Sequence, residues 1–85
     1  MIIVGTLESS DCMITMKKAD QNTIEVDSIV FEAFGQQIKA VIESALLEAN
    51  INNVTVICQD KGALDYTIKA RMQTAIERYI KEGFS

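Results

Sequence analysis

The spacing of apolar residues changes partway along the chain, and this change constrains the fold more than any other feature. Residues 2–7 form a run of strand length, and apolar and polar residues alternate over residues 12–17 and 23–27. Alternation is the pattern of a strand with one buried face. From about residue 30 the apolar residues recur every three or four positions, as on one face of a helix. The chain is therefore expected to begin with strands that later helices cover.

The second half is expected to contain two helices with a strand between them. Helical spacing covers about residues 30–49 and residues 64–83, and an alternating run at 54–59 lies between. Ser28 or Asp27 is expected to cap the first helix, and Gly35 to weaken or break its first turn. The apolar helix faces consist of Phe34, Ile38, Val41, Ile42 and Ala45, and of Leu64, Ile68, Met72, Ala75, Ile76 and Tyr79. Phe31 is also expected in the core.

This order, β-β-β-α-β-α, predicts an α+β fold. Each helix has one apolar stripe to bury, so we expect a two-layer sandwich in which two helices cover a mixed sheet of about four strands. The short connection between the second and third strands favours an antiparallel hairpin of these two. The helical crossover can place the third and fourth strands parallel. Eighty-five residues make a single domain, residues 1–85.

Charge and hydropathy exclude several classes of protein. The net charge is −4, which argues against binding a nucleic-acid backbone. No stretch approaches the roughly 20 apolar residues of a membrane span, and the first residues lack the basic start of a secretory signal. We therefore expect a cytoplasmic protein that binds neither membrane nor nucleic acid.

The two cysteines and the lack of histidine bear on metal binding and catalysis. Cys12 and Cys58 match no metal motif, and both fall in strand-like runs, so we expect reduced, buried thiols and no metal site. The chain has no histidine, and no nucleophile stands beside a candidate general base. Catalysis by the chain's own side chains is therefore not expected.

A short acidic segment, Gly5-Thr6-Leu7-Glu8-Ser9-Ser10-Asp11, separates the first two strand-like runs. By itself it is a solvated turn that carries two hydroxyls. The segment nevertheless resembles the attachment segment of the citrate lyase acyl carrier proteins, the gamma subunits of that enzyme. The resemblance extends to Asp60-Lys61-Gly62-Ala63-Leu64-Asp65, to residues 27–30 and to residues 70–71, and so covers almost the whole chain.

The resemblance implies that Ser9 is the site of covalent attachment of a prosthetic arm. In that family the arm is 2'-(5''-phosphoribosyl)-3'-dephospho-CoA, joined to the serine through a phosphodiester by a holo-ACP synthase. Its thiol carries acetyl or citryl groups during cleavage of citrate to acetate and oxaloacetate. The implied partners are the alpha subunit (acetyl-ACP:citrate transferase) and the beta subunit (citryl-ACP lyase). The chain itself would be a non-catalytic carrier.

Two other functions remain open. A carrier subunit of malonate decarboxylase would bear the same kind of arm, although its serine lies in a Gly-Ser-Gly-Asp-like context. The sequence around Ser9 and the segment 60–65 favour a citrate lyase carrier over a malonate decarboxylase carrier. The third hypothesis is an interaction domain that carries no covalent group.

The residues around Ser9 have expected roles of their own. Glu8, Ser10 and Asp11 either guide the modifying enzyme or only solvate the bend. The hydroxyl of Ser9 should stand clear of the sheet, and both carboxylates should face solvent because unpaired carboxylates are costly to bury. Leu7, with Cys12 or Met13, should anchor the bend in the core.

A second group of charged residues lies in the segment 60–65. Asp60 and Lys61 either dock a partner subunit or, together with Asp65, stay solvated at a turn that Gly62 permits.

Overall fold

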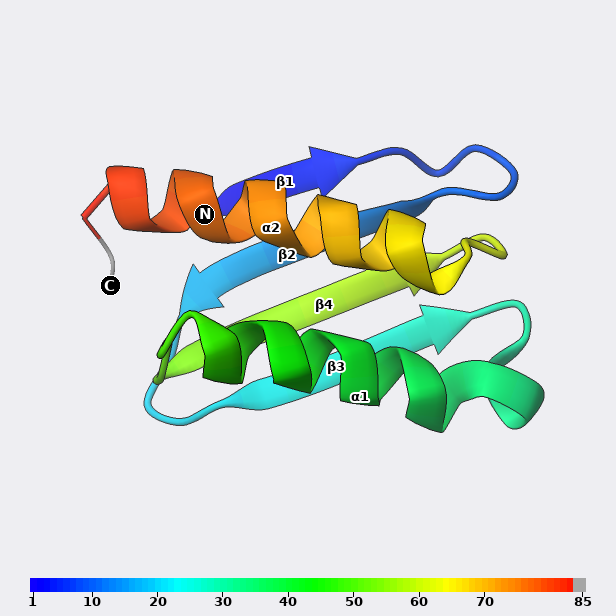
Figure 1. Cartoon of the computed structure of the whole chain (residues 1–85), viewed down its shortest axis with the longest axis horizontal. Coiled ribbons are helices and arrows are strands. Elements are labelled where there is room, and N and C mark those ends of the chain that lie inside the picture. The colour runs from blue at the N-terminus through cyan, green and yellow to red at the C-terminus, as the bar shows by residue number, and fades with distance from the viewer. Residues whose placement is uncertain (84–85) are drawn as a thin grey trace.

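The computed structural model describes residues 1–83, and in these the expected element order is confirmed. The strands are β1 (Ile2–Gly5), β2 (Cys12–Lys18), β3 (Thr23–Ser28) and β4 (Val54–Asp60), and the helices are α1 (Phe31–Glu48) and α2 (Asp65–Lys81). Both helices lie on the same face of one four-stranded sheet (Figure 1), α1 against β3 and α2 against β1 and β2. The predicted two-layer α+β sandwich with a mixed sheet is therefore confirmed.

The strand order is β1-β2-β4-β3, so the predicted hairpin of β2 and β3 is wrong. β4 lies between these two strands, antiparallel to β2 and parallel to β3, which confirms the parallel crossover through α1. The reason is burial, because the inward residues of β4 are all fully buried whereas those of β3 are only half-buried. A strand with the first pattern suits the centre of a sheet, and one with the second suits an edge. The connection between β2 and β3 passes the start of β4, where Ala19 N donates to Asn53 O (2.9 Å).

The core lies between the sheet and the helices. It contains the inward apolar residues of β1, β2 and β4, four buried residues of α1 and five of α2, and Ile24 and Val26 of β3 pack at its margin. Tyr79 is buried as expected, but Phe31, Phe34 and Leu64 are exposed. Phe31 and Phe34 lie in the first turn of α1, which projects past the end of the sheet, and Leu64 directly precedes α2.

The start of α1 differs from its prediction in two ways. Val30 is the residue before the helix and no side chain caps it. Ser28 instead ends β3 and accepts a hydrogen bond from Val30 N (3.1 Å), so it lies two residues before the capping position of α1. Gly35 does not break the helix, because the Phe31 ring covers it: a Cβ there would lie 2.5 Å from Phe31 Cδ2.

The two cysteines are free, buried thiols on neighbouring strands, as expected. A hydrogen bond with the Cys12 thiol, together with burial, raises the pKa of Cys58, so this residue stays protonated at neutral pH. Within residues 1–83, neither helix is long and apolar enough to cross a membrane.

Candidate attachment site

Three connections of the chain meet at one end of the sheet, on the right in Figure 1. They are residues 6–11 between β1 and β2, residues 29–30 between β3 and α1, and residues 61–64 between β4 and α2. Ser9 lies in the first of them and is exposed. The expected position of Ser9, on a bend between two strands with its side chain outside the core, is therefore found. We refer to this end of the molecule as the attachment end.

Two residues with positive φ angles, Gly5 and Ser10, shape the bend. Gly5 has φ +102°, and a Cβ there would lie 2.0 Å from the carbonyl oxygen of Cys12. Only glycine allows this close approach of the two strands. Ser10 has φ +66°, in the left-handed region that favours glycine, and Asp11 N donates to Glu8 O (3.2 Å). Ser9 therefore sits near the tip of a tight turn of fixed shape.

The loop after β4 holds this turn through two backbone hydrogen bonds. Ser10 N donates to Lys61 O (2.8 Å), and Lys61 N donates to Asp11 O (2.9 Å). The segments 5–11 and 60–65, which residues 12–59 separate in the sequence, are thus side by side. The conformation of the residue directly after Ser9 depends on the loop that follows β4.

The carboxylate of Asp11 accepts four hydrogen bonds from three residues, which corrects the expectation that it faces solvent. Arg71 donates to both its oxygens, from Nε at 3.0 Å and from NH2 at 2.6 Å. Thr6 Oγ1 (2.6 Å) and Cys12 N (2.7 Å) also donate to the carboxylate, which is 15% exposed. The Arg71 hydrogen bonds, followed by that of Thr6, hold the pKa of Asp11 well below its usual range. Asp11 therefore fastens the turn to α2, whereas Glu8 is exposed as expected.

Asp60 is buried, which corrects both of its expected roles. Its side chain is 1% exposed, so it is not solvated and a partner protein cannot touch it directly. Ser28 Oγ donates to Oδ2 (2.7 Å) and Ala63 N donates to Oδ1 (2.9 Å). Asp60 thus joins the end of β3 to the loop before α2. Lys61 is partly exposed, and its docking role stays a prediction; Gly62 has φ +90°, as its turn requires.

Other expectations about the turn fail for local reasons. Leu7 is exposed rather than anchored, because it lies beyond the last residue of β1 and has no layer above it. Cys12 does point into the core. The sequence predicts no role for Arg71, because a separation of 60 residues from Asp11 does not indicate a contact.

The side chains at this end do not form a catalytic centre among the described residues. No three cysteine, aspartate or glutamate side chains gather closely enough there to hold a metal ion, and the chain has no histidine. What the arrangement supplies is an accessible hydroxyl on a rigid turn.

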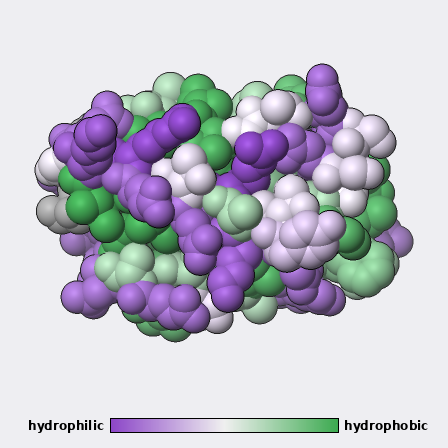
Figure 2. Space-filling view, turned by 45° about the horizontal axis from the view of Figure 1, so that its top comes forward, coloured by the Kyte–Doolittle hydropathy of each residue, from purple (hydrophilic) through white to green (hydrophobic). Residues whose placement is uncertain are grey.

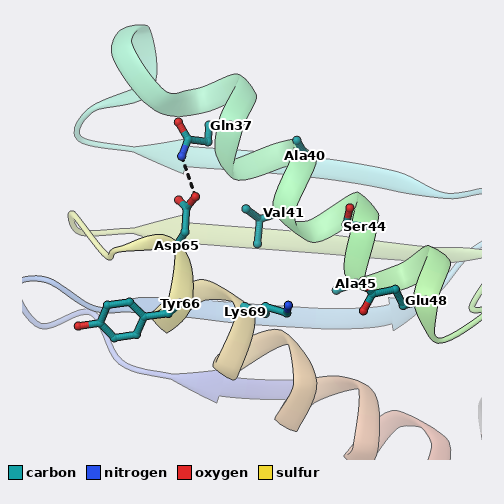
Figure 3. Close-up of a pocket in the computed structure, with 9 residues that line it drawn as sticks. All are labelled: Gln37, Ala40, Val41, Ser44, Ala45, Glu48, Asp65, Tyr66 and Lys69. Atoms are coloured by element: carbon teal, nitrogen blue, oxygen red, sulfur yellow. Dashed lines mark hydrogen bonds between the residues drawn. The ribbon is translucent and has the colours of Figure 1, made fainter.

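An open groove runs between the two helices, away from the sheet. A cavity of about 520 Å³ is lined by small residues of α1, including Ala40, Val41 and Ser44, and by Tyr66 and Lys69 of α2 (Figure 3). Gln37 Nε2 donates to Asp65 Oδ2 across it (2.7 Å), at the end nearer the first turns of the helices.

Comparisons with known proteins show the family to which the chain belongs. Residues 1–79 match the acyl carrier protein family described as malonate decarboxylase delta subunit. The chain is 47% identical over 78 residues to the citrate lyase acyl carrier protein of Halothermothrix orenii, covering 91% of this chain and 83% of that protein. It is 52% identical over 75 residues to that of Latilactobacillus sakei, covering 87% and 74%.

A solved structure shares the fold. A chain of the Pseudomonas malonate decarboxylase hetero-tetramer in complex with malonate superposes with a TM-score of 0.75, at 16% identity, covering 91% of this chain and 80% of that one. With the family match and the identities above, the conclusion follows that this chain belongs to the family of the citrate lyase acyl carrier proteins, which the malonate decarboxylase delta subunit also represents.

Proposed function

We propose that this chain is the acyl carrier subunit of a citrate lyase and that Ser9 carries its prosthetic arm. The observation that carries the proposal is the exposed Ser9 on a turn fixed by Gly5, Lys61 and the Asp11–Arg71 pair. The names of relatives at 40–52% identity support the choice of complex. The chain then has no catalytic centre of its own, and the complex is expected in the cytoplasm.

The arm proposed for Ser9 is 2'-(5''-phosphoribosyl)-3'-dephospho-CoA, in phosphodiester linkage to Oγ. When attached, it supplies a terminal thiol that carries acetyl and citryl groups between the alpha and beta subunits. The chain's own part is mechanical. A rigid turn fixes the origin of a long tether, and tethering raises the local concentration of the acyl group at each active site.

The residues beside Ser9 divide into two groups. Glu8 is exposed and can be read directly by a holo-ACP synthase. Ser10 is exposed too, but its left-handed backbone and its bond to Lys61 O give it a structural task. Asp11 acts through its hold on the turn, because four hydrogen bonds already occupy its carboxylate. Lys61 is partly exposed next to the turn and remains the proposed contact to a partner subunit.

A second candidate is the carrier subunit of a malonate decarboxylase. The description of the matched family and the shared fold of the solved decarboxylase chain favour it. Citrate lyase is favoured by the sequence motif Glu8-Ser9-Ser10-Asp11 and by the relatives named citrate lyase acyl carrier protein. We therefore keep the decarboxylase as the alternative, and an unmodified interaction domain as the hypothesis to be excluded first.

The mass of the intact protein, purified from its own host, tests the proposal. Holo protein should be heavier by one nucleotide-type arm, and digestion should place this mass on the peptide that contains Ser9. Ser9→Ala should abolish the addition, whereas the neighbouring Ser10→Ala should retain it. An unmodified protein would favour the interaction domain, and an arm that survives in Ser9→Ala would refute the assignment of Ser9.

A further inference from the structure

Large apolar side chains are exposed around the attachment end, close to Ser9. Within residues 1–83, six of the ten exposed large apolar residues belong to its connections or to the first turns of the helices: Leu7, Ile29, Phe31, Phe34, Leu64 and Tyr66. Figure 2 shows apolar surface at this end, on the right as in Figure 1, in separate pieces among polar surface. Exposed apolar side chains gathered around one end of a fold are a candidate interaction site.

The centre of this surface is concave. A cavity of about 430 Å³ lies between the first turns of α1 and the loop before α2, with Val30, Phe34, Ala63 and Leu64 among its lining. We call it the Leu64 groove. Leu64, directly before α2, is 60% exposed beside it, whereas Ile68 and Met72, which follow on the same helical stripe, are buried. The groove can receive a protruding apolar side chain from another molecule.

The groove and the Ser9 turn are parts of one rigid unit. Gly62 lines the groove and directly follows Lys61, whose backbone makes both hydrogen bonds to the turn. The buried Asp60 fixes the same loop from the other side through Ala63 N. A molecule seated in the groove is therefore held at a fixed position relative to Ser9.

The groove could hold the arm, a second copy of the chain or a different protein, and the charge of this end favours one of these three. The exposed carboxylates there, Glu8, Glu32 and Asp65, outnumber the two partly exposed lysines, Lys39 and Lys61, and Arg71 is paired with Asp11. The proposed arm carries phosphates, which these carboxylates repel, so the arm is directed away from the groove. A second copy of the chain would bring the same acidic groups face to face and cover Ser9. A different protein with basic residues around an apolar side chain fits both the shape and the charge.

We propose that the Leu64 groove is the docking site of the enzyme that attaches the arm to Ser9, which inserts an apolar side chain ringed by lysine or arginine. This inference rests on the proposed function of Ser9. The docking contact lies outside the reacting atoms. It binds substrate and transition state alike, so its loss raises KM and leaves kcat nearly unchanged.

The test is the steady-state modification of the full-length apo chain by the arm-transferring enzyme, followed by intact mass. Leu64→Ala should raise KM about tenfold, equivalent to about 1.4 kcal/mol of binding, with kcat within about twofold. Phe34→Ala should act in the same direction. Leu47→Ala is the matched control, because Leu47 is 74% exposed at the far end of α1 and should leave KM unchanged. Added salt should raise the KM of the original chain, and less so in Glu32→Gln.

Several results would overturn the docking site. An unchanged KM for Leu64→Ala and Phe34→Ala, with Ser9 fully modified, would refute the groove and leave the carrier function standing. Faster alkylation of the arm's thiol in holo Leu64→Ala, without a change in KM, would assign the groove to the arm. A dimer that Leu64→Ala dissociates would assign it to a second copy. No modification of Ser9 in the original chain would instead refute the proposed function itself.

Discussion

Replacing Arg71 by methionine should loosen the Ser9 turn and destabilise the fold by about 1.5 kcal/mol. Two charge-assisted hydrogen bonds to Asp11 are lost, each contributing about 1.5–3 kcal/mol in a buried setting. Arg71 is 36% exposed, so water and salt screen the pair and reduce its contribution toward the value of about 1 kcal/mol that exposed pairs reach. Methionine keeps the packing of the aliphatic stem and removes the charge.

Thermal unfolding followed by circular dichroism measures this effect. In a domain of this size about 1.5 kcal/mol corresponds to a fall in Tm of roughly 6–12 °C. Arg78→Met is the matched control on the same helix, since Arg78 is exposed, and its effect should stay within about 0.5 kcal/mol. Equal Tm values for the two variants would refute the view that the Asp11–Arg71 pair fastens the turn.

The same pair predicts a dependence on pH. Arg71 and Thr6 hold the pKa of Asp11 below its ordinary value of about 3.9, so the unfolded chain binds the proton first. The stabilisation is complete above about pH 4 and is lost as the pH falls further, toward the lowered pKa of the folded state. The Tm difference between the original chain and Arg71→Met should therefore shrink below about pH 4. A difference that is constant down to pH 2 would contradict this.

Two further substitutions test the backbone and the buried carboxylate. Gly5→Ala should destabilise by about 3 kcal/mol or more, because positive φ and a clash with a backbone carbonyl combine, whereas Gly83→Ala, with positive φ but open space, should cost about 1 kcal/mol in urea unfolding. Ser28→Ala should cost about 2 kcal/mol, because the buried carboxylate of Asp60 loses its hydroxyl donor, while the exposed Ser44→Ala should be nearly neutral. A smaller effect of Gly5→Ala than of Gly83→Ala, or of Ser28→Ala than of Ser44→Ala, would refute the respective argument.

Periodicity predicted every element of the fold but not the neighbours of β3. Alternation states which face of a strand is buried and not which strand lies beside it, so a short connection favoured the wrong hairpin. The full burial of Val54, Val56 and Cys58 is the physical reason that β4 is central. The sequence shows three apolar residues there, but it shows a comparable alternation in β2.

Only part of the candidate site could be predicted, because the sequence shows local turns but not contacts between distant residues. The motif placed Ser9 on an exposed bend, because glycine and short polar residues mark turns locally. The burial of Asp60 and the pairing of Asp11 with Arg71 depend on contacts across 32 and 60 residues. Phe34 and Leu64 continue helical stripes beyond the edge of the sheet, where periodicity cannot tell a buried position from an exposed one.

Transfer of label from citrate to the chain tests the central claim most directly. Holo protein whose arm thiol is first acetylated with unlabelled acetyl is mixed with the alpha and beta subunits and with carbon-labelled citrate, so that citryl replaces acetyl and acetate leaves. The protein is then digested and analysed by mass spectrometry. The account predicts label on the arm of the Ser9 peptide, removable by hydroxylamine as expected of a thioester, and no label in Ser9→Ala. In the control, labelled malonate replaces citrate and a malonate decarboxylase replaces the alpha and beta subunits. The arm should then carry no label. An unlabelled Ser9 peptide in an assembly that cleaves citrate would contradict the account.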